Sequence, residues 1–339
     1  MNVMKAINKQ KKDSFSLALV VFIVSSIIWS VSSAGIKVGL VLDKGGKDDK
    51  SFNSSAYEGA MKAVKNLGIE LKYVEATDSN SLESLHRNFA QKKYDLIIGI
   101  GFAQADAVKK VSALFPETHF AIVDGNVEGP NIRTLLFQEH EGSFLMGAAA
   151  AMKSKTGVVG FIGGMDIPLI RRFQKGYEAG AKHINPKIVV LNNFIGVTGE
   201  AWNNPAKAKE IALAQISQKA DVIFHAAGAS GSGLFDAAAD KKVFAIGVDS
   251  NQNWIKPGTV LTSMLKRVDV AVYDTIESAQ NKKFKAEKAL FGLKDQGVDW
   301  AQDVNNEKLW TVAEKTKMNE LKKSIIAGKV TVPDYYKTK

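Results

Sequence analysis

The chain contains no cysteine among its 339 residues. This absence excludes disulfides, cysteine nucleophiles and thiolate metal sites. It also excludes a lipid-modified N-terminal cysteine, which would tether an exported protein to a membrane. If the chain is exported, we therefore expect a freely diffusing protein without a lipid anchor, most simply in a bacterial periplasm.

The N-terminal 34 residues have the pattern of an export signal. Four lysines lie within residues 1–12, an apolar run of about fifteen residues follows at 15–29, and the small residues SVSSA end the segment at Ala34. The run is short for a membrane span. We predict a signal peptide over residues 1–34, with cleavage after Ala34. An uncleaved N-terminal anchor is the alternative, and no second long apolar run follows.

The remaining chain lacks the motifs of several enzyme classes. There is no G-x-x-x-x-G-K-[ST] sequence, and the glycine-rich stretch GASGSG at 228–233 does not match the dinucleotide fingerprint G-x-G-x-x-G. The 5 histidines show no metal-ligand spacing. No nucleophile and base stand in a known catalytic motif. We expect no enzyme, no cofactor and no metal, and an oxidoreductase is disfavoured for the same reasons.

The formal net charge is +10 at pH 7, which raises the question of a nucleic-acid or membrane partner. The lysines are scattered along the chain, however, and the densest group, NKKFKAEKALFGLK at 281–294, is interrupted by apolar residues. We interpret this group as a solvated face and expect no nucleic-acid partner. A DNA-binding regulator is also disfavoured, because the export segment occupies the place of an N-terminal helix-turn-helix.

After residue 34, short apolar strands alternate with amphipathic helices, in one series from 35 to about 137 and a second from about 157 to 249. Such alternation predicts an α/β protein with parallel sheets covered on both faces. No Pro/Gly/Ser-rich linker separates the series, so we expect two compact lobes joined by short crossings. Strands are expected at 36–43, 70–76, 95–101, 119–125, 156–164, 187–196, 221–228, 243–249 and 259–266, and further helices at 268–280 and 318–329.

Acidic residues end three of these strands: Asp43, Asp124 and Asp249. Ligands of open parallel sheets bind beyond the carboxyl ends of the strands. Carboxylates there can accept hydrogen bonds from hydroxyl and ring N–H groups. Each aspartate alone could instead be a helix cap or turn residue. Gly101, Phe102, Gly163, Gly164 and Gly228 also follow strands.

Two aromatic residues are expected in loops near these strand ends. SAYE at 55–58 has the form of a capping box, which would leave Phe52 and Asn53 in the loop before a helix. Asn204 can cap a helix that begins at Pro205, which would leave Trp202 in the matching loop of the other half. Two such rings could sandwich a nucleobase. Alternatively, both are ordinary core residues.

With these motifs, the sequence resembles the basic membrane protein (Bmp/PnrA-like) family of ABC-transporter substrate-binding proteins. The similarity covers nearly all of the chain after residue 34, in order, and its opening D-D-K-S-F-N and its G-V-D-x-[ND]-Q stretch are specific. It rests on DKGGKDDKSFNSSAYEG, FAIVDG, EGSFLMGAAAA, GVVGFIGG, FQKGYEAGAK, DVIFHAAGASGSGLFDAA, FAIGVDSNQ and SMLKRVD. The family's lipoprotein cysteine has no counterpart here.

The resemblance implies a type I periplasmic-binding-protein fold with two Rossmann-like lobes and a hinge. We place the lobes at residues 35–139 plus about 267–295 and at 140–266 plus about 296–339. It also implies eight ligand-binding residues. Asp43 and Asp124 would bind the edge of the base, and Phe52 would stack on it, as would Trp202, where relatives often have Phe. Asp249 and Lys266 would bind the ribose hydroxyls, and Asn53 and Gly228 belong to the same motif loops.

These expectations define a hypothesis: a monomeric receptor that binds a nucleoside, above all a purine nucleoside, and delivers it to an ABC permease in the inner membrane. A sugar or free-nucleobase receptor of the same fold is one alternative. A ligand sensor for a signalling partner is another, because it would have the same pocket.

Overall fold

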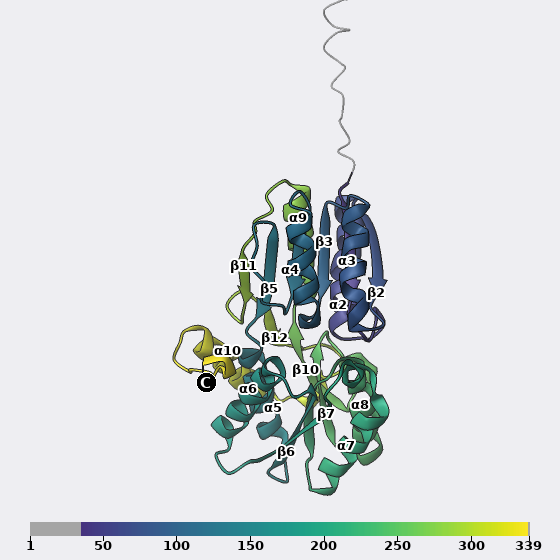
Figure 1. The fold of residues 1–339 in the computed structure, drawn as a ribbon. Coiled ribbons are helices and arrows are strands. Elements are labelled where there is room, and N and C mark those ends of the chain that lie inside the picture. Colours follow the sequence, from purple (N-terminus) through teal and green to yellow (C-terminus); the bar gives the residue numbers. More distant parts are fainter. Residues whose placement is uncertain (1–34, 338–339) are drawn as a thin grey trace, which may run out of the picture. The chain divides into compact units, whose positions relative to one another are not determined.

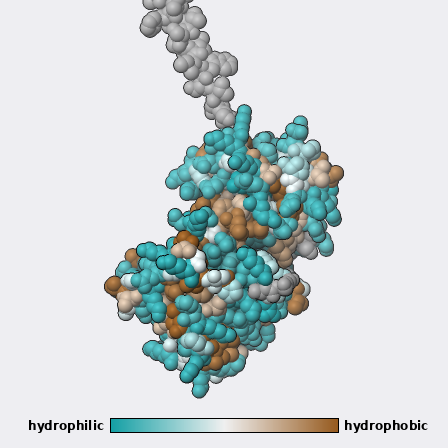
Figure 2. All heavy atoms as spheres, turned by 90° about the vertical axis from the view of Figure 1, so that its left-hand side faces the viewer, coloured by the Kyte–Doolittle hydropathy of each residue, from teal (hydrophilic) through white to brown (hydrophobic). Residues whose placement is uncertain are grey.

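The computed structural model describes residues 35–337. The predicted signal peptide, residues 1–34, lies outside this part, so its cleavage stays a prediction. Within residues 35–337, no helix has both the length and the apolar character needed to cross a bilayer. On the face shown in Figure 2, hydrophilic side chains cover most of the surface, and apolar side chains form separate, smaller areas.

Six parallel strands form the first sheet, in the order β11-β5-β4-β3-β1-β2 (Figure 1). Every position of β3, and every position of β1 after its first, is buried. Continuous burial is typical of parallel strands covered on both faces. The strands are β1 (Lys37–Leu42), β2 (Glu70–Glu75), β3 (Leu96–Ile100), β4 (His119–Val123), β5 (Ile132–Phe137) and β11 (Lys288–Phe291).

The second sheet repeats this arrangement in the order β12-β10-β9-β8-β6-β7. All neighbours are parallel except β12, which runs antiparallel to β10. In this order β9 takes the place that β4 has in the first sheet. The strands are β6 (Val158–Met165), β7 (Val189–Gly196), β8 (Val222–Ala226), β9 (Phe244–Asp249), β10 (Val260–Lys266) and β12 (Val298–Trp300).

Helices cover both faces of each sheet. Helices α2 and α9 pack on one face of the first sheet and α3 and α4 on the other. On the second sheet, α5, α6 and α10 cover one face and α7 and α8 the other. The two lobes with parallel sheets predicted from the alternation of strands and helices are confirmed, and so are the Rossmann-like lobes that the resemblance implies. The helices are α2 (Phe52–Leu67), α3 (Leu82–Gln91), α4 (Ala105–Leu114), α5 (Glu139–Lys153), α6 (Pro168–Ile184), α7 (Pro205–Ser217), α8 (Gly231–Lys241), α9 (Val268–Gln280) and α10 (Val312–Ile326).

Within residues 35–337, the chain passes between the two sheets three times. The crossings lie between β5 and α5, between β10 and α9, and between β11 and β12. Backbone hydrogen bonds connect them: the Gln138 N–H donates to the Phe291 carbonyl at 2.8 Å, and the Arg267 N–H donates to the Gly297 carbonyl at 2.8 Å. The crossings therefore form one bundle of adjacent segments.

All nine expected strands are present, and the helix expected at 268–280 is α9 with the same bounds. Strands β5, β11 and β12 were not predicted individually, and β11 lies within the stretch that we interpreted as a solvated face. The last helix, α10, begins at Val312, six residues before the expected start. Its capping box, formed by Thr311 and Glu314, explains the earlier start.

Candidate ligand-binding site

A cavity lies where the carboxyl ends of strands from both sheets meet. Its walls include residues that follow or end β1, β3, β4, β8, β9 and β10, as expected for ligand sites of parallel α/β sheets. All eight residues predicted from the sequence and the resemblance line this one cavity: Asp43, Phe52, Asn53, Asp124, Trp202, Gly228, Asp249 and Lys266. It is also lined by Lys44, Asp49, Gly101, Phe102, Leu169, Ile170, Phe173, Ala226, Ala227 and Val248.

Asp43 directly follows β1, and hydrogen bonds with Asn53 and Lys44 hold it in place. Its N–H donates to Asn53 Oδ1 at 2.8 Å, and the Lys44 N–H donates to Asp43 Oδ1 at 2.7 Å. Burial raises the pKa of Asp43 to about 6, and the hydrogen bond from Lys44 opposes this rise. A Cβ on Gly101 would lie 2.6 Å from Asp43 Oδ2, so glycine makes room for the carboxylate.

The capping box predicted at 55–58 is wrong. Helix α2 already begins at Phe52, and its first turn is capped by Asp49, whose carboxylate accepts from the N–H groups of Asn53 at 2.9 Å and Ser54 at 3.0 Å. Ser55 Oγ instead accepts from the Asp269 N–H at 3.1 Å. Phe52 and Asn53 therefore lie on the first helical turn and not in the preceding loop.

The same cap brings one end of the charged loop KGGKDDK, residues 44–50, to the cavity. Asp49 is 7% exposed, lines the cavity and also accepts from the Asn53 side-chain amide at 2.9 Å. One end of the loop thus belongs to the site, and Asp49 is not among the site residues predicted from the sequence. Only a cap pattern read from Asp49 to Asn53 and Ser54 could have identified it.

The expected cap of α7 is confirmed. Asn204 Oδ1 accepts from the Lys207 N–H at 3.0 Å, and Pro205 is the first helical residue. Trp202 lies before this cap, and a Cβ on Gly164 would lie 2.2 Å from Trp202 Cζ3, so the glycine at the end of β6 leaves space for the indole. The rings of Trp202 and Phe102 meet edge to face at 6.5 Å.

Asp124 and Asp249 occupy equivalent places, after β4 and at the end of β9. Both have left-handed backbones, with φ of 64° and 63°. Asp249 is 7% exposed and accepts from Ser51 Oγ at 2.5 Å. Burial raises the pKa of Asp249 to about 7, against the opposing effects of Lys266 and of the Ser51 hydrogen bond.

The Lys266 ammonium lies 2.6 Å from Asp124 Oδ2 and 3.1 Å from Glu139 Oε1. Burial alone would lower its pKa, but Asp124, Glu139 and Asp249 together raise the pKa above its ordinary value. The ammonium is therefore charged at neutral pH. Three aromatic rings surround it, with centroids at 5.3 Å (Phe52), 5.1 Å (Phe137) and 5.6 Å (Phe173).

Contacts across the cavity join the loop after β1 to the second lobe. Lys44 forms an ion pair with Glu200. The Ser250 hydroxyl donates to the Ser51 carbonyl at 3.1 Å, and the Gln252 amide donates to the Lys50 carbonyl at 2.9 Å. The lobes are therefore in direct contact around the cavity.

The cavity's chemistry suits a ligand with many hydrogen-bond donors and a flat face. Four carboxylates line it (Asp43, Asp49, Asp124, Asp249) against the two ammonium groups of Lys44 and Lys266. Among the described residues, no group of three or more His, Cys, Asp or Glu side chains is arranged to hold a metal. The buried His86 and His225 instead contact glutamine side chains, and burial lowers the pKa of each to about 4.

Solved structures confirm the fold. The chain is similar to an ABC-transporter solute-binding protein from Aeropyrum pernix K1, with a TM-score of 0.79 and 28% identity, over 88% of this chain and 94% of that one. Among curated relatives, a CD4+ T-cell-stimulating antigen of Listeria monocytogenes is 33% identical over 96% of this chain and 99% of its own length. An ABC transporter nucleoside-binding protein, BmpA of Lactococcus lactis, is 34% identical over 88% and 89%.

The prediction of a freely diffusing periplasmic protein without a lipid anchor is contradicted. Three Pyrococcus relatives are named lipoproteins, and the one from Pyrococcus abyssi is 34% identical over 78% of this chain and 69% of its own length. The prediction took the lack of one residue type as evidence of location. The uncleaved N-terminal anchor, the alternative given above, would need no cysteine, so the missing cysteine does not establish free diffusion.

The family model described as "Bmp: ABC transporter substrate-binding protein PnrA-like" matches residues 36–335. This confirms the resemblance found in the motifs. Members are solute-binding proteins and not enzymes, and membership implies a small-molecule ligand and a membrane permease as partners. With its two lobes, its shared cavity and this match, the chain belongs to the Bmp family of PnrA-like ABC-transporter substrate-binding proteins.

Proposed function

We propose that this substrate-binding protein binds a nucleoside, above all a purine nucleoside, in the cavity between its lobes and delivers it to an ABC importer. The observation that carries the proposal is the combination, in one cavity, of aromatic rings with carboxylates from both sheets. A flat base with N–H donors and a sugar with hydroxyl donors match these two features. The printed name of the Lactococcus lactis relative, a nucleoside-binding protein, supports the same ligand class.

In this proposal the first lobe and Trp202 bind the base. Asp43 and Asp124 accept hydrogen bonds from its edge, and Phe52 and Trp202 stack against its faces. Asn53 orients Asp43, because its side-chain oxygen accepts the Asp43 N–H at 2.8 Å. Stacking of this kind contributes about 1–3 kcal/mol per base in single-strand binders.

The second lobe binds the ribose. The carboxylate of Asp249 accepts from the ribose hydroxyls, Lys266 donates to their oxygens, and the backbone at Gly228 approaches the ligand closely. Gly228 has a φ of 56°, which glycine adopts without strain. Because each lobe supplies half of the contacts, a bound nucleoside stabilises the closed arrangement of the lobes over an open one.

The first test is a thermal-shift screen of the chain from Gly35 onward against nucleosides, free bases and sugars. A ligand that binds only the native state raises the melting temperature by mass action. We expect the largest shifts with purine nucleosides. Shifts with sugars or free bases alone would identify the alternative receptors, and no shift with any nucleoside at millimolar concentration would refute the proposal.

Calorimetry of Asp249→Ala tests the ribose assignment. A hydrogen bond to a charged group contributes about 1.5–3 kcal/mol, so we expect nucleoside affinity to fall by roughly tenfold to a hundredfold while affinity for free bases changes little. Asp240→Ala, at an exposed position on α8, is the control. Equal losses for nucleosides and bases would contradict the assignment.

A further inference from the structure

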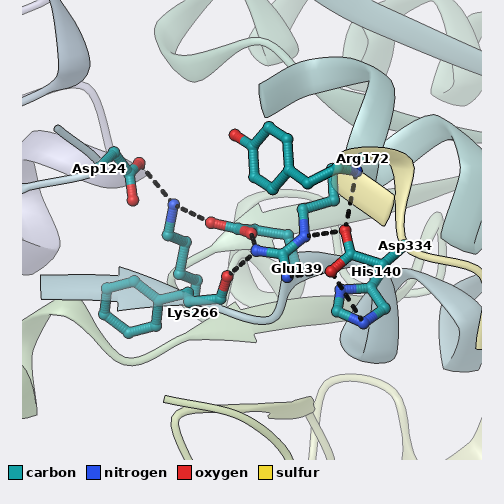
Figure 3. A network of polar contacts seen from close by, with 8 residues as sticks. Asp124, Glu139, His140, Arg172, Lys266 and Asp334 are labelled. Carbon is teal, nitrogen blue, oxygen red and sulfur yellow. Dashed lines mark hydrogen bonds and ion pairs between the residues drawn. The ribbon is translucent and has the colours of Figure 1, made fainter. Parts of the chain in front are cut away.

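Five buried or nearly buried charges form a continuous series from the cavity to the C-terminal segment (Figure 3). In order they are Asp124, Lys266, Glu139, Arg172 and Asp334, so that the sign alternates at every step. Only Asp124 and Lys266 line the cavity. The other three charges do not line the cavity and are almost fully buried, which raises the question of what they do.

Glu139 is shared between the two cations. It is 1% exposed; its Oε1 lies 3.1 Å from Lys266 Nζ and its Oε2 lies 2.9 Å from Arg172 Nη1. Each carboxylate oxygen therefore has its own cationic partner. If Arg172 moved, Glu139 would lose one of these partners and would be free to rotate. Lys266 would then lose one of the two carboxylates that hold its ammonium in place.

Arg172, 5% exposed, is held from the opposite side by the C-terminal segment. Its Nε and Nη2 donate to the two carboxylate oxygens of Asp334 at 2.8 and 2.9 Å, a bidentate pair. The ring of Tyr336 lies 4.9 Å from the guanidinium carbon. Arg172 Nη1 also donates to the carbonyl of Phe137, the last residue of β5.

The series connects two of the three crossings between the sheets. Glu139 is the first residue of α5, directly after the crossing from β5, and Lys266 is the last residue of β10, directly before the crossing to α9. Asp334 comes from the segment after α10, far away in the sequence. His140, whose Nε2 lies 4.0 Å from Asp334, adds no charge at neutral pH, because burial and Arg172 lower its pKa to about 4.

A buried ion is tolerated only while its partners stay in place, because an unpaired charge in the interior is costly. In an alternating series each member fixes the next. We therefore propose that Arg172 and Asp334 are positioning residues, which act through Glu139 to hold the Lys266 ammonium in the ligand cavity. The inference rests on the proposed function in one respect: Lys266 is taken to contact the ligand.

The chain contains a matched control beside Arg172. Arg171, on the same helix, forms a bidentate pair with Asp166 at 2.6 Å for both bonds, and its guanidinium lies 4.6 Å from the Phe194 ring. This pair is partly exposed, and Arg171 hydrogen-bonds to Asp166 and Gln174 but not to Glu139 or Lys266. Arg171→Lys and Asp166→Asn therefore make the same chemical changes outside the series.

The test measures nucleoside affinity by calorimetry for Arg172→Lys and Asp334→Asn in the full-length chain. We expect each to weaken binding by about tenfold, the lower end of what loss of a supporting partner costs in metal sites. The controls Arg171→Lys and Asp166→Asn are expected to bind as wild type does. Unchanged affinity in Arg172→Lys and Asp334→Asn, with wild type binding normally, would overturn the positioning role and leave the proposed function intact.

A double-mutant cycle separates positioning from a general loss of structure. In the Lys266→Met background, Arg172→Lys should change affinity by less than twofold, because the group on which it acts is gone. A tenfold loss in both backgrounds would show that Arg172 acts by another route. If wild type binds no nucleoside, the failure lies in the proposed function and is visible before any variant is made.

A ligand-free readout keeps the inference testable in that case. In protein labelled with ¹³C at the lysine Cε positions, the resonance absent from Lys266→Met identifies Lys266. Arg172→Lys and Asp334→Asn should shift this resonance, whereas Arg171→Lys and Asp166→Asn should leave it in place. An unmoved Lys266 resonance in all four variants would refute the inference independently of any ligand.

Discussion

Asp124 and Asp249 show how single residues aim their side chains into the cavity. Both have positive φ, a backbone region that residues other than glycine rarely adopt. Such a conformation costs on the order of 1–3 kcal/mol and persists only where the surroundings enforce it. Its occurrence at equivalent strands of the two sheets indicates that the sharp turn after the strand directs the carboxylate towards the other lobe.

Asp249 should make stability depend on pH. Because its pKa is about 7 in the folded protein and near 3.8 in the unfolded chain, the folded state retains a proton that the unfolded state loses. Stability should therefore fall as pH rises from about 4 to about 7 and then level off. The total effect is roughly 4 kcal/mol, since one pKa unit corresponds to about 1.4 kcal/mol.

Asp249→Asn removes this dependence while keeping an acceptor for Ser51. In urea unfolding, we expect the variant to gain stability relative to wild type as pH rises through this window. Asp240→Asn, at an exposed site, should show no such gain. Parallel stability curves for wild type and Asp249→Asn would mean that Asp249 does not retain its proton on folding.

The sequence predicted the aspartates at strand ends, since a strand pattern shows where its carboxyl end falls. Asp49 escaped prediction because a charge in a polar loop looks the same whether it caps a helix or faces water. Arg172 and Arg171 are likewise identical as residue types, and only the packing of α6 decides which is buried. The place of Lys266 came from the family resemblance, because its burial depends on charges distant in sequence.

At the scale of elements, helices α5 and α6 approach each other closely because glycines lie at their contact. A Cβ on Gly180 would lie 1.9 Å from the Phe144 carbonyl oxygen, and one on Gly147 would lie 1.9 Å from the Tyr177 carbonyl oxygen. Backbone atoms cannot move aside as a flexible side chain can. The contact therefore brings the backbones of α5 and α6 together. Arg172 and Phe173 also belong to α6, so this contact helps to fix their position.

Gly180→Ala should force these helices apart. Overpacking of this kind costs roughly 1–3 kcal/mol, more than the gain of about 1 kcal/mol in helix propensity. We expect a net loss in the free energy of unfolding, measured by urea denaturation. Gly196→Ala is the control, because a Cβ there would meet only the Ala201 Cβ at 3.6 Å. A stabilised Gly180→Ala protein would show that the helices can separate without cost.

Strands β11 and β12 illustrate what local sequence cannot show. They have four and three residues, and β11 is not buried at any position. Their extended conformation depends on pairing with β5 and β10, which lie far away in the chain. By contrast, the long apolar strands of both sheets carry their own signal, because burial on both faces requires continuous apolar residues.

At the scale of the whole molecule, the ion pair between Lys44 and Glu200 joins the lobes at a partly exposed place. Exposed pairs contribute about 0–1 kcal/mol, so Lys44→Glu should shift an equilibrium between closed and open lobes by up to roughly fivefold towards the open form. Small-angle scattering of the ligand-free protein should show a larger radius of gyration, most clearly at low salt.

Two further variants check that effect. Lys44→Glu combined with Glu200→Lys restores an opposite pair and should return the scattering to that of wild type. Lys47→Glu lies in the same loop but pairs with its neighbour Asp48 inside one lobe, so it should leave the scattering unchanged. An equal expansion in Lys47→Glu would assign the change to the loop's net charge and not to the ion pair.

The late position of β11 and β12 also bears on how the chain folds. The first sheet gains its last strand only at residues 288–291 and the second at 298–300, so neither is complete until most of the chain has been synthesised. Domains made of one continuous segment can fold in turn, the N-terminal one first. Here both lobes can complete their folding only near the end of synthesis. A prematurely terminated chain would leave both sheets with an unpaired edge strand, which promotes aggregation.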